Sequence, residues 1–420
     1  MRATKDSGFE WIGEIPTSWE LYKGKYMFTQ RNLRGNTIEL QLLSPTQKYG
    51  VVPQSVYEDR SGMNAVKLNE NANLSALKTI HKGDFCISLR SFQGGFEYSE
   101  YEGVVSPAYQ VFYPVVKVAR GYYKYLFKDS GFIEKMNSYT MTLRDGKNIA
   151  FADFGNTYIP CPPVDEQQHI ADFLDTKCAE IDVLTADIQS QIDTLEQYKR
   201  AVITETVTKG LNSNAEMKDS GIEWVGQIPM SWSTVPNKYL MHKIKSICPI
   251  YNGENILSLT TNGVIIRDLN GGGKMPTSFN GYQKIVPGNL LMCLFDIDVT
   301  PRCIGLIKDF GLTSPAYSQF AMKNGAYAPY YYYYYLMVDY TKELLHMAKN
   351  LRHSLTEDQL GAIKAPRPPY DEQIQIAEYL DNMCSEINQV IADKNNQLTT
   401  LDKYKKSLIF EYVTGKKEVI

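Results

Sequence analysis

Residues 162–182 read PPVDEQQHIADFLDTKCAEID and residues 368–388 read PPYDEQIQIAEYLDNMCSEIN, with twelve of twenty-one positions identical. Residues 5–20 (KDSGFEWIGEIPTSWE) match residues 218–233 (KDSGIEWVGQIPMSWS) at eleven of sixteen positions. The offsets of the two matches, 206 and 213 residues, are similar and far exceed the period of a solenoid repeat. The 420 residues are therefore expected to form two copies of one large unit, not three or four unrelated domains.

Similarity between the two copies is uneven. Their first residues and their last quarters match closely, whereas residues 25–100 and 238–310 hardly match at all. One interpretation is neutral drift in loops around a shared core. The other is a common scaffold that presents two surfaces with different binding preferences. In each copy a divergent middle is joined to a closely matched helical segment, and this combination favours the second interpretation.

Each copy ends in a segment that predicts one long helix. Pro162 and Pro163 cannot lie inside a helix, and the acidic Asp165 and Glu166 that follow are favourable at a helix N-terminus. Neither proline nor glycine then occurs before Gly210, which can end the helix. We expect about 43 helical residues, or about 65 Å, in each copy.

A heptad pattern of apolar residues runs along both predicted helices, as in a coiled coil. The first seam position holds Leu174, Ile181, Ile188, Leu195 and Val202 in the first helix, and Leu380, Ile387, Leu401 and Leu408 in the second. The pattern assigns the second seam position to Leu184, Tyr198, Val390 and Tyr404. Lys394 interrupts the pattern, and Gln191 and Gln397 are expected to be polar residues of the seam.

An exposed helix of this length needs a packing partner, because intrinsic helix propensity does not hold it in water. The apolar stripe runs the full length of each segment. We therefore expect the two helices to form an antiparallel coiled coil with pseudo-two-fold symmetry. The alternative is that each helix packs only on its own globular domain.

The formal net charge of −3 argues against a nucleic-acid-binding protein when it is taken alone, because such proteins are usually basic. The charge is unevenly distributed along the chain. Residues 1–160 and 213–367 each carry +3, whereas residues 161–212 carry −6 and residues 368–420 carry −3. The globular parts are therefore mildly basic, and the acidic excess belongs to the helices.

The sequence lacks the patterns of several protein classes. It contains no apolar run long enough to cross a membrane and no signal-peptide h-region, and its seven cysteines are scattered, so we expect a cytoplasmic chain with reduced thiols. Phosphate-binding, dinucleotide-binding and metal-binding motifs are also missing. The sequence 367–370, RPPY, has arginine where amino-methyltransferases need an amine-binding side chain. We therefore expect no catalytic residue, no cofactor and no metal site.

With these features in hand, the chain resembles the specificity subunits of type I restriction-modification systems. The resemblance covers the whole chain in family order. It rests on the opening G-x-E-W-x-G-x-I-P-x-x-W, on the P-P-x-x-E-Q-x-x-I-A-x-x-L-D entry to each long helix, and on the Y-K-x-x-x-I near the end of each helix. Because the combination occurs twice in register, it is specific.

The resemblance implies an α+β fold and four segments: target recognition domains of mixed α/β fold at 1–161 and 213–367, and long helices at 162–212 and 368–420 with the C-terminal tail. Each recognition domain would bind one half of a bipartite double-stranded DNA target, and the helices would set the spacing between the halves. Two modification (methyltransferase) subunits and, for cleavage, two restriction subunits would assemble on a chain that catalyses nothing itself.

Residue types that bind phosphates or base edges give the candidate DNA contacts. In the first copy they are Lys48, Arg90, Ser91, Phe92, Gln93, Arg144 and Lys147, and in the second copy Arg267, Lys274, Arg302, Arg352 and His353. Arg144 and Arg352 lie in shared sequence context, which favours contact with the DNA backbone rather than with bases. For residues 90–95 a simple hairpin turn is the alternative.

Six consecutive tyrosines, 330–335, correspond to Tyr122-Tyr123-Lys124-Tyr125 in the first copy. Since six successive residues cover every face of a helix, core packing is the first interpretation, and contact with DNA or the methyltransferase is the second. Two other functions remain open for the whole chain. One is a scaffold that binds only proteins, and the other is a methyltransferase or nuclease with an unrecognised site.

Overall fold

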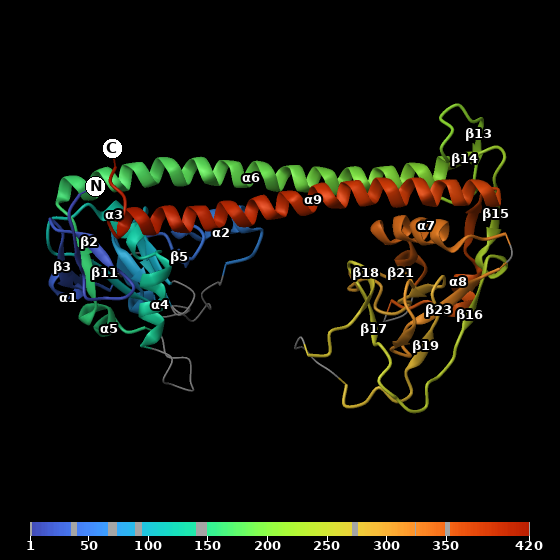
Figure 1. Cartoon of the computed structure of the whole chain (residues 1–420), viewed down its shortest axis with the longest axis horizontal. Helices are drawn as coiled ribbons and strands as arrows, with labels where there is room; N and C mark the ends of the chain where they lie inside the picture. The colour runs from blue at the N-terminus through green and yellow to red at the C-terminus, as the bar shows by residue number, and fades with distance from the viewer. Residues whose placement is uncertain are drawn as a thin grey trace. The chain divides into compact units, whose positions relative to one another are not determined.

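The computed structural model describes residues 2–34, 40–65, 74–88, 95–139, 149–270, 276–323, 325–348 and 353–419 (Figure 1). The chain forms two compact units. The first comprises Met1–Ile188 and Asn396–Ile420, and the second comprises Gln189–Asn395. The two long helices α6 (Val164–Lys209) and α9 (Tyr370–Val413) each contribute residues to both units. The compact units thus divide the helices near their middles, whereas the expected segments 162–212 and 368–420 set them apart from the globular parts.

In the first unit the elements before α6 alternate short strands with short helices. They are β1 (Thr4–Asp6), β2 (Glu14–Pro16), β3 (Glu20–Lys23), α1 (Gly24–Met27), β4 (Phe28–Gln30), β5 (Leu43–Thr46), β6 (Gly50–Pro53), α2 (Gln54–Ser61), η1 (Leu74–Ala76), β7 (Lys78–Ile80), β8 (Phe85–Ile87), β9 (Phe96–Tyr98), β10 (Gly103–Val105), β11 (Gln110–Pro114), α3 (Arg120–Leu126), α4 (Ser130–Ser138), α5 (Phe151–Asn156) and β12 (Tyr158–Cys161).

The second unit has a closely similar series between α6 and α9. Its elements are β13 (Met217–Asp219), β14 (Gln227–Pro229), β15 (Ser233–Pro236), η3 (Asn237–Tyr239), β16 (Met241–Ile244), β17 (Leu257–Thr260), β18 (Gly263–Ile266), β19 (Gln283–Ile285), β20 (Leu290–Met292), β21 (Ile304–Leu306), β22 (Gly311–Thr313), β23 (Ser318–Met322), α7 (Ala328–Tyr340), η4 (Glu343–Met347), α8 (Glu357–Ala362) and β24 (Lys364–Arg367).

The two units share one sheet topology. A four-stranded antiparallel sheet has the order β4-β11-β8-β9 in the first unit and β16-β23-β20-β21 in the second. In each unit an antiparallel hairpin, β5–β6 or β17–β18, precedes the central strands of that sheet. The middles of the copies, which hardly match in sequence, therefore have the same fold. This finding confirms the α+β class, with two β-rich domains and two long helices packed together.

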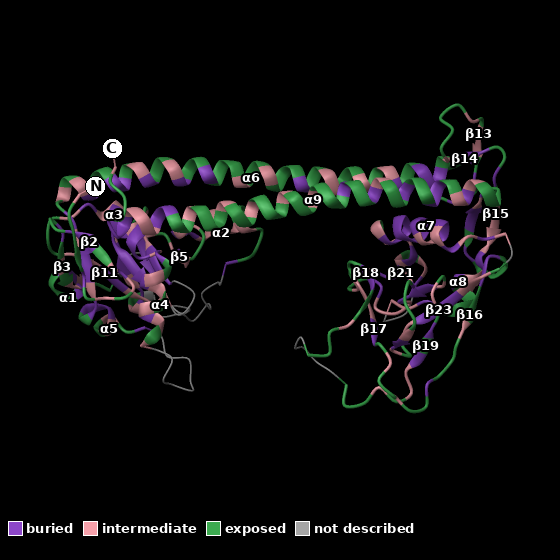
Figure 2. Ribbon diagram, in the orientation of Figure 1, coloured by how far each residue is buried: buried purple, intermediate pink, exposed green. Residues whose placement is uncertain are grey.

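Aromatic rings fill the core of the first unit. Phe28 is buried, and its ring lies 5.2–5.9 Å from those of Phe85, Phe112, Tyr123, Phe127 and Phe154. Most of these contacts are edge-to-face, the geometry in which the ring quadrupoles attract each other. The sheet and helices α3 and α5 thus close on one aromatic cluster. Figure 2 shows buried residues gathered in the sheet of this unit.

The tyrosine run forms helix α7 and belongs to the core of the second unit. All six of its tyrosines except Tyr332 are buried, and Tyr332 packs against the core as a partly buried side chain. Core packing, the first interpretation of the run, is therefore what the structure shows. Four of the buried hydroxyls donate to acceptors in the chain, as when Tyr333 donates to Asp381 of α9 at 2.6 Å.

Matched hydrogen bonds attach both units to the long helices and explain why the repeated blocks are so similar. Tyr122 donates to the carbonyl of Val413 at 2.6 Å, and Tyr330 donates to the carbonyl of Val207 at 3.0 Å. The helix-entry glutamates accept the indole N–H of the opening tryptophans: Trp19 donates to Glu166 at 3.0 Å and Trp232 donates to Glu372 at 2.9 Å. The repeated sequence blocks thus encode the same joint twice.

The glycines that follow the long helices are required by backbone conformation. Gly210 and Gly415 both have φ of +74°, a left-handed conformation that suits glycine at a helix C-terminus. A Cβ atom on Gly210 would lie 2.7 Å from a Glu372 oxygen, and one on Gly415 would lie 2.5 Å from Pro16. These glycines therefore let the chain turn directly against the next element of the joint.

The two long helices run antiparallel within each unit. In the second unit Lys199 bonds Asn388 at 3.0 Å, and Lys394 bonds Gln191. In the first unit Lys405 bonds Asp182 at 2.6 Å. Partner numbers fall on one helix as they rise on the other. Each helix also packs on a globular part, since Leu174 belongs to the core of the first unit and Leu380 to that of the second. The alternative that each helix packs only on its own globular domain is therefore wrong.

The two seam positions predicted from the heptads differ in exposure. The residues of the first position are all buried or half-buried. At the second, Leu184 and Tyr198 are each 51% exposed, and Val390 and Tyr404 are 43% and 54% exposed. The covered residues lie one place later: Cys178, Thr185, Ile192, Lys199 and Thr206 in α6, and Cys384, Ile391, Leu398, Lys405 and Tyr412 in α9.

This second seam position was missed because several of its residues are polar or small and give no apolar signal. The same shift places Gln191 and Gln397 on the exposed side, so the prediction of polar glutamines inside the seam is wrong. Lys394 does interrupt the first position, where its ammonium bonds Gln191. Within the described residues, no helix has both the length and the apolar character needed to span a membrane.

Candidate nucleic-acid interface

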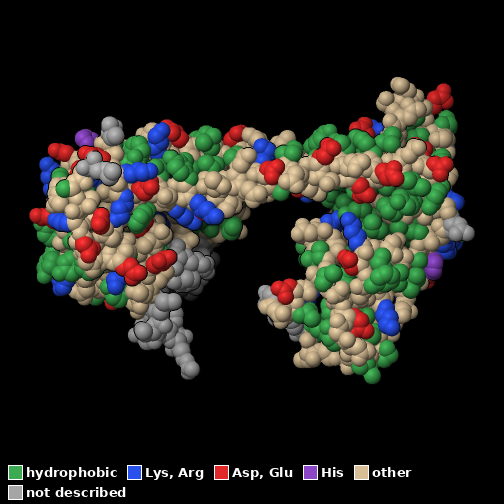
Figure 3. All heavy atoms as spheres, viewed as in Figure 1, with side chains coloured by type: hydrophobic (Ala, Val, Ile, Leu, Met, Phe, Trp, Pro, Cys, Tyr) green, Lys and Arg blue, Asp and Glu red, His purple; other side chains and the backbone are tan. Residues whose placement is uncertain are grey.

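Eight of the predicted DNA contacts lie outside the described residues. They are Arg90, Ser91, Phe92, Gln93, Arg144, Lys147, Lys274 and Arg352. The structure describes the other four, Lys48, Arg267, Arg302 and His353. Figure 3 shows that Lys and Arg are interspersed with Asp and Glu over the face in view, as the mild charge of the globular parts implies. The position of single basic side chains is therefore more informative than net charge.

Lys48 lies at the turn of the β5–β6 hairpin, where it is exposed. Its ammonium is 5.2 Å from the centre of the Tyr49 ring, and the Arg60 guanidinium from α2 is 5.7 Å from the same ring. The Tyr49 hydroxyl donates to the Arg60 carbonyl at 3.2 Å, which holds α2 beside the hairpin. Two cations and an aromatic face are thus presented together, a combination suited to phosphates and bases.

Arg302 connects the corresponding hairpin of the second unit to helix α7 by hydrogen bonds. Its guanidinium donates to the carbonyls of Thr261, in the β17–β18 turn, and Ile304, the latter at 3.1 Å, and to the Tyr332 hydroxyl of α7. The side chain is half-buried. The structure therefore gives Arg302 a role in joining the hairpin to the helix of tyrosines, a role that sequence reasoning did not foresee.

His353 and Asp298 meet at the edge of the second sheet. Nδ1 of His353 lies 2.9 Å from Oδ2 of Asp298, and the hydrogen bond from His353 lowers the pKa of Asp298. His353 has φ of +41°, and its carbonyl accepts from the backbone N–H of Ile297. Lys342 donates to the carbonyl of Thr300 at 2.7 Å. The loop at 296–302 is thus fixed at both ends by polar contacts.

Arg267 follows strand β18, and its backbone N–H donates to the carbonyl of Ile256 at 2.7 Å. Burial raises the pKa of Tyr317, and the positive charge of Arg267 opposes that rise. Arg267 and Arg302 thus belong to the hairpin region of the second unit, as Lys48 does in the first. The participation of Arg60 was missed, because only the folding of α2 brings it to the hairpin.

A buried acid follows the segment 90–95 in the sequence. Glu97 of β9 is fully buried and forms an ion pair with Lys128 at 2.6 Å. Among the described residues its second oxygen, Oε2, has no hydrogen-bond partner. Burial raises the pKa of Glu97 to about 7, although Lys128 opposes the shift. The folded chain thus keeps Glu97 protonated at pH values where an exposed glutamate is ionised.

This shift predicts a pH-dependent contribution to stability. The folded chain retains a proton on Glu97 between the ordinary pKa of 4.5 and about 7, whereas the unfolded chain loses it, so stability falls as pH rises through that window. We expect Glu97→Gln to raise the free energy of unfolding at pH 8 by on the order of 2 kcal/mol and to change it little at pH 4. Urea unfolding at both pH values measures this, with the exposed Glu134→Gln as control. A destabilised variant at pH 8 would contradict the assignment.

Comparison with known proteins supports the family on sequence. Residues 17–194 match the family model described as "Type I restriction modification DNA specificity domain". The chain is 27% identical over 303 residues to the type I restriction enzyme MjaVIII specificity subunit of Methanocaldococcus jannaschii, covering 66% of this chain and 67% of that one. It is 26% identical over 279 residues to the putative type I restriction enzyme MjaX specificity subunit of the same organism, covering 61% and 59%.

Solved structures support the fold. One chain from a structural study of complex assembly and conformational transition of the type I R-M system aligns with a TM-score of 0.72 at 13% identity, covering 96% of this chain and 99% of that one. The HsdS subunit from Thermoanaerobacter tengcongensis aligns with a TM-score of 0.51 at 14% identity, covering 98% and 100%. Residues 17–194 thus match the DNA specificity domain of type I restriction-modification systems, and the chain is similar in sequence to specificity subunits of those systems and in fold to solved type I structures.

Proposed function

We propose that each unit of this specificity subunit contacts one half of an asymmetric, bipartite DNA target, and that α6 and α9 set the spacing of the halves. The observation that carries the proposal is a contrast between framework and surface. The joints to the helices share equivalent hydrogen bonds, as in the Trp19–Glu166 and Trp232–Glu372 pairs. The turns of the matching hairpins carry different side chains, Gln47-Lys48-Tyr49 in the first unit and Thr261-Asn262 in the second. A shared scaffold with unlike surfaces suits a target with two unlike halves.

An antiparallel pair of long helices would suit duplex DNA, whose strands are also antiparallel. Membership in the family implies DNA and the modification and restriction subunits as partners in general. We further propose that the long helices bind two modification subunits and that two restriction subunits join for cleavage, with the complex acting in the cytoplasm.

Salt dependence tests the proposed contact at Lys48. In the complex with modification subunits, Lys48→Ala should weaken binding to the bipartite duplex similarly for all base sequences, and should reduce the slope of log affinity against log salt by about 1. The control is Lys406→Ala, which removes an exposed lysine paired with Asp402 on α9. Equal effects of the two substitutions on affinity and on slope would refute a phosphate contact at Lys48.

Two rival functions make different predictions. A scaffold that binds only proteins would give the assembled complex no salt-sensitive preference for one gapped duplex over scrambled DNA. A methyltransferase or nuclease with an unrecognised site would act without partners. Incubation of the purified chain with labelled methyl donor and with plasmid DNA tests that rival, and methyl transfer or cleavage by the chain alone would overturn the non-catalytic assignment.

A further inference from the structure

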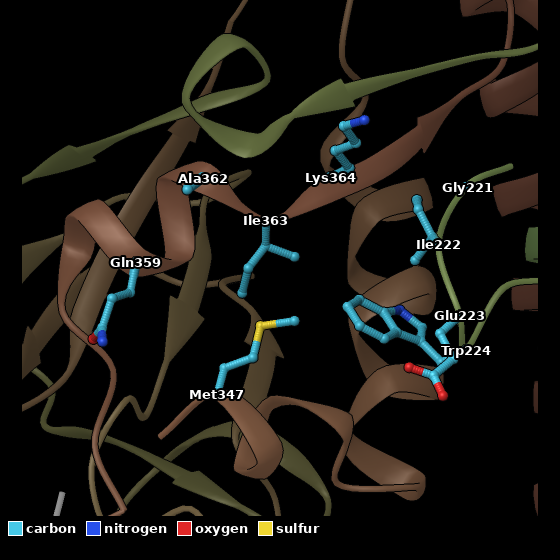
Figure 4. Close-up of a pocket in the computed structure, with 9 residues that line it drawn as sticks. All are labelled: Gly221, Ile222, Glu223, Trp224, Met347, Gln359, Ala362, Ile363 and Lys364. Carbon is cyan, nitrogen blue, oxygen red and sulfur yellow. The ribbon is translucent and has the colours of Figure 1, made fainter. Parts of the chain in front are cut away.

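The second unit contains a cavity of about 470 Å³, and none of the residues that line it is a candidate DNA contact. Four segments of the unit line it: the β13–β14 turn, the end of η4, helix α8 and the start of β24. Figure 4 shows the side chains of Trp224, Met347 and Ile363 reaching toward the same space from three of these segments. The volume lies within the range of ligand-binding pockets.

The first unit fills the corresponding place with its own rings. Phe9, in the β1–β2 turn, stacks on Tyr158 with ring centres 5.0 Å apart and planes at 27°. The repeat places Ile222 and Lys364 at these two positions in the second unit. Both replacements remove an aromatic ring, and both residues line the cavity. The cavity is therefore the space that a stacked aromatic pair occupies in the other copy.

A third ring is also replaced. Tyr139 follows α4, and its hydroxyl lies 3.1 Å from that of Thr157. In the second copy Met347 takes the place of Tyr139, and Ile363 takes the place of Thr157. Both residues line the cavity. A methionine side chain is flexible and polarisable, and it makes favourable contacts with aromatic rings.

The back wall of the cavity is fixed in place. The indole N–H of Trp224 donates to the Tyr334 hydroxyl of α7 at 3.2 Å. In the first unit Leu126 stands where Tyr334 does, and the buried indole nitrogen of Trp11 has no hydrogen-bond partner among the described residues. Within the described residues, the second copy thus holds its tryptophan by a hydrogen bond that the first copy lacks. This bond fixes the indole at one face of the cavity.

The rim of the cavity is polar and carries both signs of charge. Glu223, Gln359 and Lys364 line it and are exposed, and Gly221 leaves the backbone of the turn accessible beside them. An apolar floor with a mixed polar rim matches a side chain that arrives on a polypeptide, whose flanking amides and charges meet the rim.

We propose that this cavity binds an aromatic side chain of a partner protein, which takes the place that Phe9 and Tyr158 fill in the first unit. Because the first unit is already filled by its own rings, the partner can attach in this way to the second unit alone. The two copies of the duplicated chain therefore differ in protein binding as well as in their hairpins.

N-acetyl-tyrosine amide is a suitable probe, with N-acetyl-leucine amide for comparison, and the full chain is labelled on Ile and Met methyl groups for NMR. We expect saturable shifts of the methyl groups of Ile222, Met347 and Ile363 with a millimolar dissociation constant. The tyrosine probe should bind at least about fivefold more tightly than the leucine probe. Equal binding of both probes, or no saturable shift, would overturn the proposal.

Exchanging the two copies' residues provides matched variants. Ile222→Phe with Lys364→Tyr should abolish the shifts at Met347 and Ile363, while Ile266→Phe, which adds a ring to the exposed face of β18, should leave them unchanged. Phe9→Ile with Tyr158→Lys should add a second binding site per chain, detected by calorimetry. Persistent binding in the filled variant, with the fold verified by its other methyl signals, would contradict the assignment.

Discussion

Inserting one heptad into each long helix is expected to lengthen the gap in the DNA target and to leave both half-sites unchanged. The insertions belong after Ile188 and after Asn395, where the compact units divide α6 and α9. Seven residues preserve the seam register and add about 10 Å of helix, which corresponds to about three base pairs at 3.4 Å each. Affinity for the original target should fall at least about 100-fold, because only one half can then be engaged at a time.

Selection from a duplex library with variable gaps measures this effect. The insertion variant should recover the original half-sites separated by a longer gap, and a duplex with that gap should restore binding. The uninserted chain with the same library is the control. Recovery of altered half-site sequences would contradict the proposed role of the helices, because it would mean that they take part in base recognition.

Phe28→Ala is expected to destabilise the first unit by about 3–5 kcal/mol and to leave the second unit nearly unaffected. Phe28 is 1% exposed, and five aromatic rings surround it, so its removal is expected to leave a cavity among these rings. The hydrophobic clusters of the two units share no buried residue, which confines the loss to one of them.

Denaturant unfolding followed by hydrogen exchange of peptides from each unit measures the two stabilities separately. Phe310→Ala removes the same side chain at a position that is 71% exposed, and should change stability by less than about 0.5 kcal/mol. Equal loss of protection in both units of Phe28→Ala would show that the units unfold together, against the expectation of two separate cores.

The sequence was sufficient to predict the duplication and the helices because the residues that form the joints are repeated. Trp19 and Trp232, or Glu166 and Glu372, are conspicuous in the two blocks, and the structure assigns them to equivalent hydrogen bonds. The shared strand order of the divergent middles could not be predicted in this way. A strand there needs only apolar residues at core positions, and many sequences satisfy that requirement.

The positions of individual side chains could not be predicted from the sequence, for local physical reasons. Leu184 and Tyr198 have the apolar character of seam residues but are half exposed, while the covered Thr185 and Lys199 carry no apolar signal. Arg302 looks in sequence like a DNA contact, yet folding directs its donors to Thr261, Ile304 and Tyr332. Donor type predicts what a side chain can bind, and only the fold decides which acceptors it meets.

Methylome sequencing of the host with and without this chain tests whether it directs methylation to a bipartite DNA target. We expect one gapped motif with two different half-sites to lose its methylation when the chain is absent and to regain it when the chain is restored. An unchanged methylome, or the loss of an uninterrupted motif, would contradict the assignment of one half-site to each unit.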